Sequence, residues 1–314
     1  MRIIDNKKDY YDYLSYLFFS HLYKYRWEFC YFYCMVDVPC IIKWIGSKRI
    51  QSGEIVQYFP NFINTYYEPF CGGCSVLFQL LSSPNHYVNR CVCSDINGDL
   101  IDLWNTVKRD PDGLYDEYVR MWTEMKSIED RQDKRKYFEM IREEFNQTRS
   151  PYCFFFLMRT CTNGIPRYNK YGNFNNTFHL TRDGVQPKII KKIIYRWSKL
   201  LNDNNVLFKR CDYKVMMDAA GLDDFVYLDP PYEMTRSTGK YFGKVDYLDM
   251  FSRLSLYNDR GIKFALSFDS VDENLIIPGD CYENRIDITS KNAGYRKTLL
   301  KMDNKDVYES LYVN

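Results

Sequence analysis

Short apolar runs recur in two separate parts of this sequence, and each run stops at a polar or turn-forming residue. Runs of this length with such boundaries are typical of buried strands. The runs that we interpret as strands lie just before Gly72, at 91–93, at 206–208, at 225–228 and at 264–268. Helical stretches separate them, so the pattern predicts an α/β fold on an open sheet. Residues 285–288 and 307–313 are interpreted as late antiparallel strands.

The segment 110–200 between these parts has a helical pattern instead. Residues 113–149 are strongly charged, and their expected inward side chains are Leu114, Tyr118, Met121 and Met125. A further helix is expected from Pro187. Its predicted inward side chains are Ile189, Ile190, Ile193 and Trp197, and its basic side carries Lys188, Lys192, Arg196 and Lys199. A basic helix side next to a polar loop suits a phosphate backbone, with a solvated helix face as an equal alternative.

The run 225–228 ends at Asp229-Pro230-Pro231-Tyr232. Two consecutive prolines fix their φ angles and donate no backbone hydrogen bonds, so this loop is stiff. It follows the carboxyl end of a strand, where open α/β sheets bind their ligands. A carboxylate, the Pro230 carbonyl and an aromatic face suit a planar ring that bears an amino group. A proline turn with no further role is the alternative.

Three other stretches contain candidate ligand-binding residues. Ser47 is expected to cap a helix over 48–59 with Ile50, Ile55, Val56 and Phe59 inward, and Lys48 in its first turn would pair with a ligand carboxylate. The Gly72-Gly73 turn, followed by a helix from about Ser75, would let the backbone approach a ligand closely. Its spacing is not that of a pyrophosphate-binding turn. Asp95 ends the 91–93 run, which makes it a candidate ribose ligand or the start of an Asx turn.

The stretch 162–176 is rich in turn formers and alternates polar with aromatic residues, which predicts a hairpin or structured loop. Amide and guanidinium side chains are those that read base edges. This loop supplies them at Asn163, Arg167 and Asn169, among others.

Composition narrows the classes of protein. The net charge of +2 excludes a general polycation, so any nucleic-acid surface must be local. Eleven cysteines without a regular framework indicate free thiols in a reducing compartment. A zinc site at Cys71, Cys74, Cys91 and Cys93 is disfavoured by the spacing of the second pair. No metal is expected.

Residues 1–34 are dense in aromatic side chains that charges interrupt, so neither a spanning helix nor a signal peptide is expected there. We interpret them as an amphipathic helix and hypothesise that Met35 is the working start.

Several short motifs occur here in an order that resembles the Dam-type (D12 class) N6-adenine DNA methyltransferases over about residues 40–314. The motifs are Lys43-Trp44-Ile45-Gly46-Ser47-Lys48, Glu68-Pro69-Phe70-Cys71-Gly72-Gly73-Cys74-Ser75, Ser94-Asp95-Ile96-Asn97, Asn163-Gly164-Ile165-Pro166-Arg167-Tyr168-Asn169, Gly172-Asn173-Phe174-Asn175, Asp229-Pro230-Pro231-Tyr232, and a tail with Arg285, Arg296 and Glu309-Ser310-Leu311. Cys74 stands where many relatives carry a glycine, and Thr162 where some carry an aromatic wedge.

The resemblance implies a Rossmann-like methyltransferase sheet with helices on both faces, S-adenosylmethionine as methyl donor and duplex DNA as substrate. It divides the chain into the extension 1–34, a catalytic domain of 35–108 and 203–314, and a mainly helical DNA-recognition domain of 109–202. The residues expected to line the donor pocket are Trp44, Lys48, Phe70, Gly72, Asp95, Asp212 and Tyr213. Those expected to hold the target adenine are Asp229, Pro230 and Tyr232. Arg167 is expected to read a base and the region of Asn163 to fill the gap that the flipped base leaves.

The expected reaction is in-line attack of the flipped adenine N6 on the donor methyl, with Asp229 and the Pro230 carbonyl accepting its hydrogens. The resemblance therefore implies a site-specific enzyme in the cytoplasm of a bacterial or phage-infected cell, in restriction-modification or another role. No membrane contact is expected, and no obligate protein partner is evident. The alternatives are an N4-cytosine DNA methyltransferase and a catalytically silent DNA-binding relative. A zinc-binding structural module, and a methyltransferase acting on protein or RNA, are less favoured.

Overall fold

The computed structural model describes residues 37–231, 245–268, 277–290 and 307–314. The extension 1–34 and the hypothesis about Met35 lie outside these residues, as do Tyr232 and Arg296. Within the described part of the chain, every helix is too short or too polar to cross a membrane.

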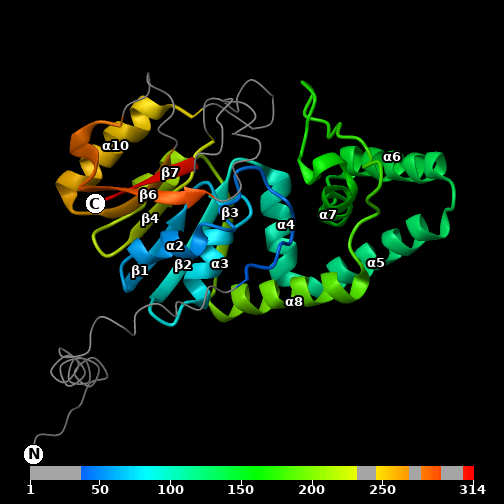
Figure 1. Ribbon diagram of the computed structural model, residues 1–314, viewed down its shortest axis with the longest axis horizontal. Helices are drawn as coiled ribbons and strands as arrows, with labels where there is room; N and C mark the ends of the chain where they lie inside the picture. Colours follow the sequence, from blue (N-terminus) through cyan, green and yellow to red (C-terminus); the bar gives the residue numbers. More distant parts are fainter. Residues whose placement is uncertain (1–36, 232–244, 269–276, 291–306) are drawn as a thin grey trace, which may run out of the picture. The chain divides into compact units, whose positions relative to one another are not determined.

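One twisted sheet organises the described residues (Figure 1). Its strands are β1 (Phe62–Glu68), β2 (Tyr87–Asp95), β3 (Leu207–Arg210), β4 (Phe225–Leu228), β5 (Lys263–Phe268), β6 (Asn284–Ser290) and β7 (Val307–Val313). They lie in the order β3-β2-β1-β4-β5-β7-β6, and β7 alone runs antiparallel to the rest. The predicted Rossmann-like sheet is confirmed, and so is the antiparallel pair at the end of the chain.

This strand order places a topological switch point between β1 and β4. The chain builds β1, β2 and β3 towards one edge and then returns to add β4 and β5 on the other side of β1. Helices that leave neighbouring strands in opposite directions open a crevice at the carboxyl ends of those strands. Glu68 ends β1, and Asp229 directly follows β4. The fold therefore brings two carboxyl groups that are far apart in sequence to one crevice.

Both faces of the sheet are covered, as the unbroken apolar run of β4 requires. Val226 and Leu228 point into a cluster with α9 (Tyr213–Asp218) and α10 (Tyr247–Arg260). Phe225 and Tyr227 point the other way, with ring centroids 4.5 and 5.6 Å from that of Phe59. All four β4 side chains are buried, because alternate residues of a strand face opposite layers.

An aromatic cluster joins the second face to the helices outside it. Trp104 of α4 (Gly98–Arg109) stacks on Phe208 of β3 and meets Trp197 of α8 (Pro187–Asp203), with ring centroids 5.6 and 4.7 Å away. Trp197 also contacts Phe78 of α3 (Ser75–Ser82). Large buried rings of this kind contribute much of the burial energy of a core.

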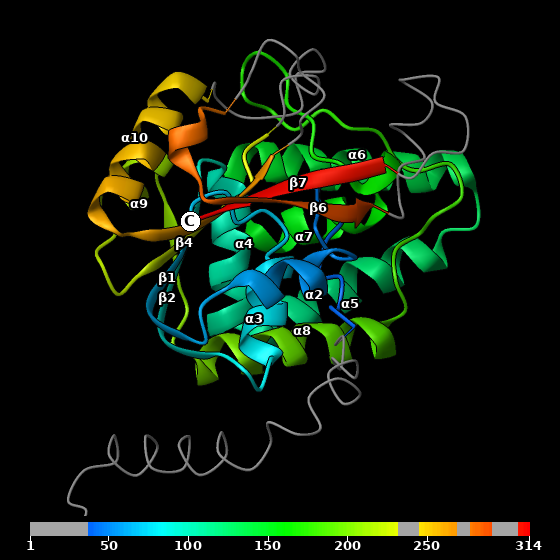
Figure 2. The same cartoon turned by 60° about the vertical axis from the view of Figure 1, so that its left-hand side comes forward.

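The remaining helices form a layer beside α4, which Figure 2 shows behind the sheet. They are α5 (Pro111–Ser127), α6 (Arg131–Thr148) and α7 (Pro151–Thr160), and α4 packs against both α7 and α8. The predicted inward face of α5 is confirmed, because Leu114, Tyr118, Met121 and Met125 are fully buried. Residues 113–149 form two helices, since Asp130 caps α6 through the Gln132 and Asp133 amides.

Two helix predictions need correction. The helix expected over 48–59 is one short turn, α2 (Ser52–Ile55), followed by the 3-10 turn η1 (Val56–Tyr58). Ile50 precedes both turns and is exposed. On α8, Ile189 is exposed and Ile194 is buried in its place, with Ile190 and Trp197. The apolar stripe of α8 therefore lies slightly rotated from its expected position.

Candidate active site

A pocket opens at the carboxyl ends of β1, β2 and β4. All seven residues predicted to line a donor pocket contribute to its wall: Trp44, Lys48, Phe70, Gly72, Asp95, Asp212 and Tyr213. Asp229 and Pro230 line the same pocket, so the structure brings the two predicted groups together. Tyr232, the third residue of the adenine group, lies outside the described residues.

A buried charge network lies at the inner end of this pocket. Lys48 Nζ is 2.5 Å from Asp229 Oδ1 and 3.0 Å from Glu309 Oε1. Gln51 Nε2 donates to the other Glu309 oxygen at 2.9 Å. The side chain of Lys48 is only 4% exposed. One ammonium is therefore shared between two carboxylates, one in the loop after β4 and the other on β7.

The network sets the protonation of its members. Burial lowers the pKa of Lys48, but Asp229 and Glu309 more than offset it, so the net pKa lies above the ordinary value. Burial raises the pKa of Asp229 to about 6, against the opposing effect of Lys48 and with the help of Glu309. Asp229 is thus a carboxylate at neutral pH, able to accept a hydrogen bond.

Glu68 forms part of the pocket wall close to this network. It is 3% exposed and accepts a hydrogen bond from the Tyr66 hydroxyl at 3.0 Å. Burial raises its pKa to about 8, and the charge of Asp229 acts in the same direction. Glu68 is therefore mostly protonated at neutral pH, and Asp229 is the negative group of the pair.

The glycine turn holds the donor side of the pocket. Gly72 accepts a hydrogen bond from Trp104 Nε1 at 2.9 Å, and its amide donates to Asp95 Oδ2 at 3.3 Å. Its φ of +45° lies in the left-handed region, and so does the φ of +52° at Cys74. A Cβ on Gly72 would lie 2.8 Å from Trp44 Cδ1, which is too close. The turn thus needs glycine at this position.

Replacing Gly72 by alanine is expected to destabilise the protein by about 1–3 kcal/mol and to weaken ligand binding, because the new methyl group must displace Trp44 and strain the backbone. Thermal unfolding with and without ligand measures both effects. Gly73→Ala is the matched control, since its Cβ would meet Trp44 Cβ and Ser47 Oγ at 3.5 and 3.6 Å, which are ordinary contacts. Equal losses in the two variants would contradict this account of the turn.

Asp95 forms the Asx turn that the sequence left as one alternative, and it also contacts the glycine turn. Oδ1 accepts from the Asn97 amide at 2.9 Å in an Asx turn, and Oδ2 faces the Gly72 amide. Burial raises the pKa of Asp95 to about 6, against these two hydrogen bonds. Each oxygen keeps a second lone pair for a ligand hydroxyl.

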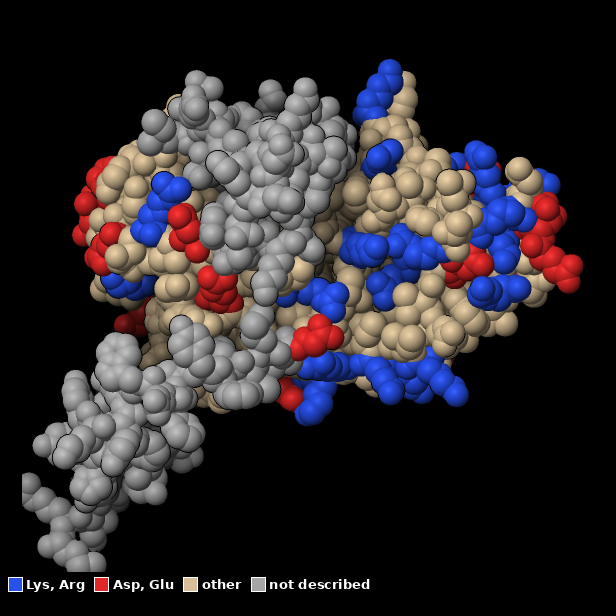
Figure 3. Space-filling view, viewed as in Figure 1, with Lys and Arg blue, Asp and Glu red and all other residues tan. Residues whose placement is uncertain are grey.

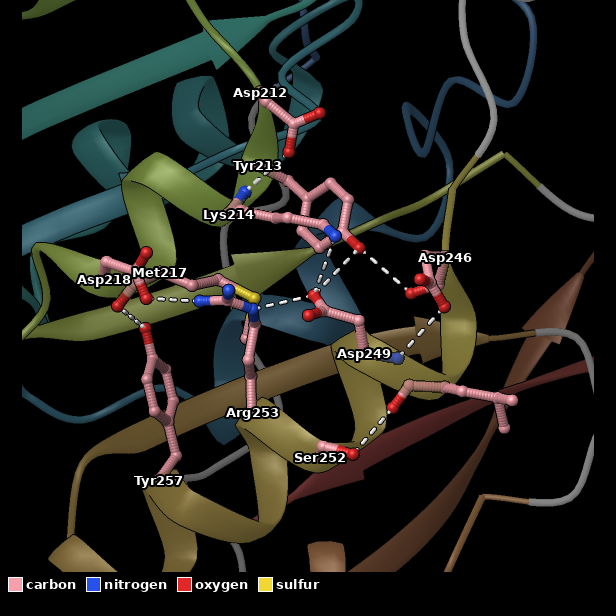
Figure 4. A network of polar contacts seen from close by, with 11 residues as sticks. Asp212, Tyr213, Lys214, Met217, Asp218, Asp246, Asp249, Ser252, Arg253 and Tyr257 are labelled. Atoms are coloured by element: carbon pink, nitrogen blue, oxygen red, sulfur yellow. Dashed lines mark hydrogen bonds and ion pairs between the residues drawn. The ribbon is translucent and has the colours of Figure 1, made fainter.

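Asp212 and Tyr213 are held at the pocket by a surface network that joins α9 to α10 (Figure 4). The Tyr213 hydroxyl donates to the Asp246 carbonyl at 3.0 Å, and Arg253 bridges Asp249 and Asp218. The Phe70 ring stacks on Tyr213, with centroids 5.3 Å apart. These contacts keep an aromatic surface in place beside the glycine turn.

The polar loop after α7 is tied to the rim of the pocket. The Tyr168 hydroxyl donates to Asp99 Oδ2 at 2.7 Å in the first turn of α4. Arg149 reaches both Asp99 and the Gly172 carbonyl. Two isolated bridges, Cys161–Phe178 and Tyr168–Phe174, give the loop a partial hairpin.

Within this loop the predicted DNA-contacting side chains differ in their surroundings. Asn163 and Arg167 are exposed. Asn163 has a φ of +59°, at the tip of the 3-10 turn η2 (Thr162–Gly164). The side-chain oxygen of Asn169 accepts from the Tyr171 and Asn173 amides, so this residue shapes the loop.

The last turns of α8 lie at the other end of α4 from this loop. Asn202 and Ser198 of α8 hydrogen-bond to Lys108 in the last turn of α4, whereas Tyr168 binds the first turn. Nine residues of helix separate these contacts, or roughly 14 Å. In Figure 3 basic side chains line the lower edge, where Figure 1 places α8, and a separate group lies higher on the helical layer.

The sheet order and the pocket at its switch point define a Rossmann-like α/β enzyme. Within that class, the chain belongs to the family of D12 class N6 adenine-specific DNA methyltransferases, which matches residues 44–275. This family methylates adenine in DNA, and the resemblance seen in the sequence is confirmed.

Named relatives agree with this family. The chain is 31% identical over 253 residues to the type II methyltransferase M.MjaIII of Methanocaldococcus jannaschii, covering 74% of this chain and 84% of that protein. It is 29% identical to the DNA adenine methylase of Haemophilus influenzae, over 64% of this chain and 66% of that protein. An rRNA methyltransferase, aviRa from Streptomyces viridochromogenes, superposes with a TM-score of 0.39 and 12% identity over 89% of this chain and 90% of that one.

Proposed function

We propose that this protein transfers a methyl group from S-adenosylmethionine to the N6 amino group of an adenine flipped out of duplex DNA. The observation that carries the proposal is the shared pocket, in which Asp229 and Pro230 stand opposite a turn and an aromatic pair suited to a nucleoside. An enzyme that modifies a base must take it out of the stack, so a deep pocket at the end of β4 is required.

The donor fits the residues on the glycine side of the pocket. Asp95 offers lone pairs to ribose hydroxyls, and the Phe70–Tyr213 pair offers an aromatic surface to an adenine ring. Gly72 permits close approach of the backbone, while Trp44 and Asp212 complete the wall. The donor supplies an electrophilic methyl group on a sulfonium. The protein's part is to hold both partners in line and to exclude water.

On the substrate side, Asp229 and the Pro230 carbonyl accept the two N6 hydrogens. Hydrogen bonds of this kind favour a pyramidal nitrogen, whose lone pair is then directed at the methyl group. The Asp229 carboxylate also stabilises the positive charge that develops on N6. The stiffness of the Pro230-Pro231 backbone holds both acceptors in position. Tyr232 is proposed to stack on the base.

Incubation with tritiated S-adenosylmethionine and unmethylated DNA, followed by nucleoside analysis, tests the proposal. Label in N6-methyladenine is expected, and sequencing of the same DNA reveals the recognition site. Label in N4-methylcytosine would favour the alternative base. Donor binding by calorimetry without any transfer would favour a silent DNA-binding relative.

We also propose that segment 109–202 recognises DNA in a cytoplasmic setting, while 35–108 and 203–314 carry the chemistry. Arg167 and Asn163 lie on the loop tied to the pocket rim, so they are assigned to base contacts. Lys188, Lys192 and Arg196 are assigned to phosphates on a separate surface. Arg196 already donates to the Asp37 carbonyl, so its share of that binding is the smallest.

Exchange of Arg167 for alanine is therefore expected to weaken specific binding by about 1–3 kcal/mol and to relax the sequence preference. Lys188→Ala should weaken binding to every sequence equally and reduce the salt slope by about one. Binding titrations on specific and scrambled duplexes at several salt concentrations measure both. A uniform loss in the Arg167 variant would remove its assignment to a base.

A further inference from the structure

Glu309 is the member of the buried charge network for which the sequence predicted no role. It lies on β7, the last strand, and is 6% exposed. Its two oxygens accept from Lys48 at 3.0 Å and from Gln51 at 2.9 Å. A buried carboxylate costs considerable desolvation energy, and an apolar side chain at this position would avoid that cost. The acidic group therefore calls for an explanation beyond packing.

The charges of the network explain what Glu309 adds. Lys48 and Asp229 alone would form a neutral pair, in which the ammonium makes the carboxylate a weaker acceptor for any other donor. Glu309 adds one negative charge beside this pair, and Lys48 divides its hydrogen bonds between two carboxylates. Asp229 thereby stays a stronger acceptor for a group outside the pair.

The proposed reaction needs such an acceptor. As the N–C bond forms, the S–C bond breaks and its electron pair stays on the donor sulfur, which becomes a neutral thioether. Positive charge moves onto the adenine N6, which then releases one proton to solvent. The negative charge that Glu309 adds near N6 favours the charge that develops there.

We propose that Glu309 is a positioning residue for methyl transfer, which acts through Lys48 to keep Asp229 available as an acceptor. This inference rests on the proposed function. Glu309 itself reaches no reacting atom. Its effect is electrostatic, so it must be visible in the pH dependence of the reaction.

The direction of that pH effect follows from the groups around Asp229. Glu309, Glu68, Tyr227 and Lys48 all face Asp229. Glu68 is mostly protonated and Tyr227 is a neutral phenol at neutral pH, so Glu309 and Lys48 are the charges that act on Asp229. The charge of Glu309 raises the pKa of Asp229 and that of Lys48 lowers it. Removing the Glu309 charge must therefore move the acid limb of kcat/KM to lower pH.

The test compares Glu309→Gln with the wild-type enzyme in methyl transfer to DNA. We expect kcat to fall about tenfold at neutral pH with KM nearly unchanged, and the acid limb to move to lower pH. Glu309→Asp keeps the charge and should restore the wild-type limb. Asp287→Asn is the matched control, because this carboxyl lies opposite Ser310 in the β6–β7 register and is 59% exposed.

A second variant covers the case in which Glu309→Gln does not fold. Gln51→Lys places an ammonium beside Glu309 and neutralises it from outside, so it should move the acid limb in the same direction. A fall in kcat with an unmoved limb in the folded variants would assign Glu309 to packing and overturn the proposal. Inactive wild-type enzyme would instead refute the proposed function, so the two failures are distinguishable.

Discussion

Replacing Asp229 by alanine is expected to lower methyl transfer by about 10²–10³-fold or more, because the acceptor that stabilises charge on N6 is lost. Fold and donor binding should survive. Lys48 keeps its partner Glu309 at 3.0 Å, so the change does not leave a buried ammonium unpaired. Single-turnover assays measure the rate, and calorimetry measures donor affinity.

Two further variants sharpen this result. Asp229→Asn keeps the shape and one acceptor oxygen but lacks the charge, so it should lose most of the activity as well. Asp223→Ala removes an exposed carboxylate just before the start of β4, away from the pocket end of the strand, and it should leave activity unchanged. Retention of a tenth or more of the wild-type rate in the alanine variant would contradict the role assigned to Asp229.

Lys48→Met is expected to destabilise the folded protein by about 3–5 kcal/mol at pH 8, because it leaves Asp229 and Glu309 buried without their shared cation. The loss should shrink as the pH falls. Without Lys48 the pKa of Asp229 rises further above its unfolded value, so the folded state binds more protons than the unfolded state. Stability relative to wild type must then fall as pH rises.

Urea unfolding at pH 5.5 and pH 8 measures this dependence. Lys199→Met is the matched control, since it breaks an ion pair with Asp203 whose lysine side chain is 77% exposed. That change should cost less than about 0.5 kcal/mol at either pH. A pH-independent loss in the Lys48 variant would show that packing of its stem, and not its charge, stabilises the network.

The local pattern of the sequence predicted the main helices and strands, and the resemblance to a family predicted most of the site. Residues next to one another in the sequence set the ends of the apolar run 225–228 and of the turns at Gly72 and Asp229, so these boundaries could be predicted. The seven residues assigned to the donor wall by resemblance all line one pocket. Periodicity was less reliable at helix ends, as Ile50 and Ile189 show, because it does not reveal which neighbour covers a side chain.

The tertiary structure decided how distant charges meet. Lys48, Asp229 and Glu309 are separated by 181 and 80 residues, and no spacing rule joins them. They meet because the sheet order sets β4 beside β1 and returns β7 next to β5. The same holds for α8, whose last turns bind the opposite end of α4 from the polar loop. The sequence thus determined the helices and strands and the chemical types of side chain available to the site, since these follow from local chemistry. The charge balance of the site required the fold, because electrostatic coupling depends on distance in space.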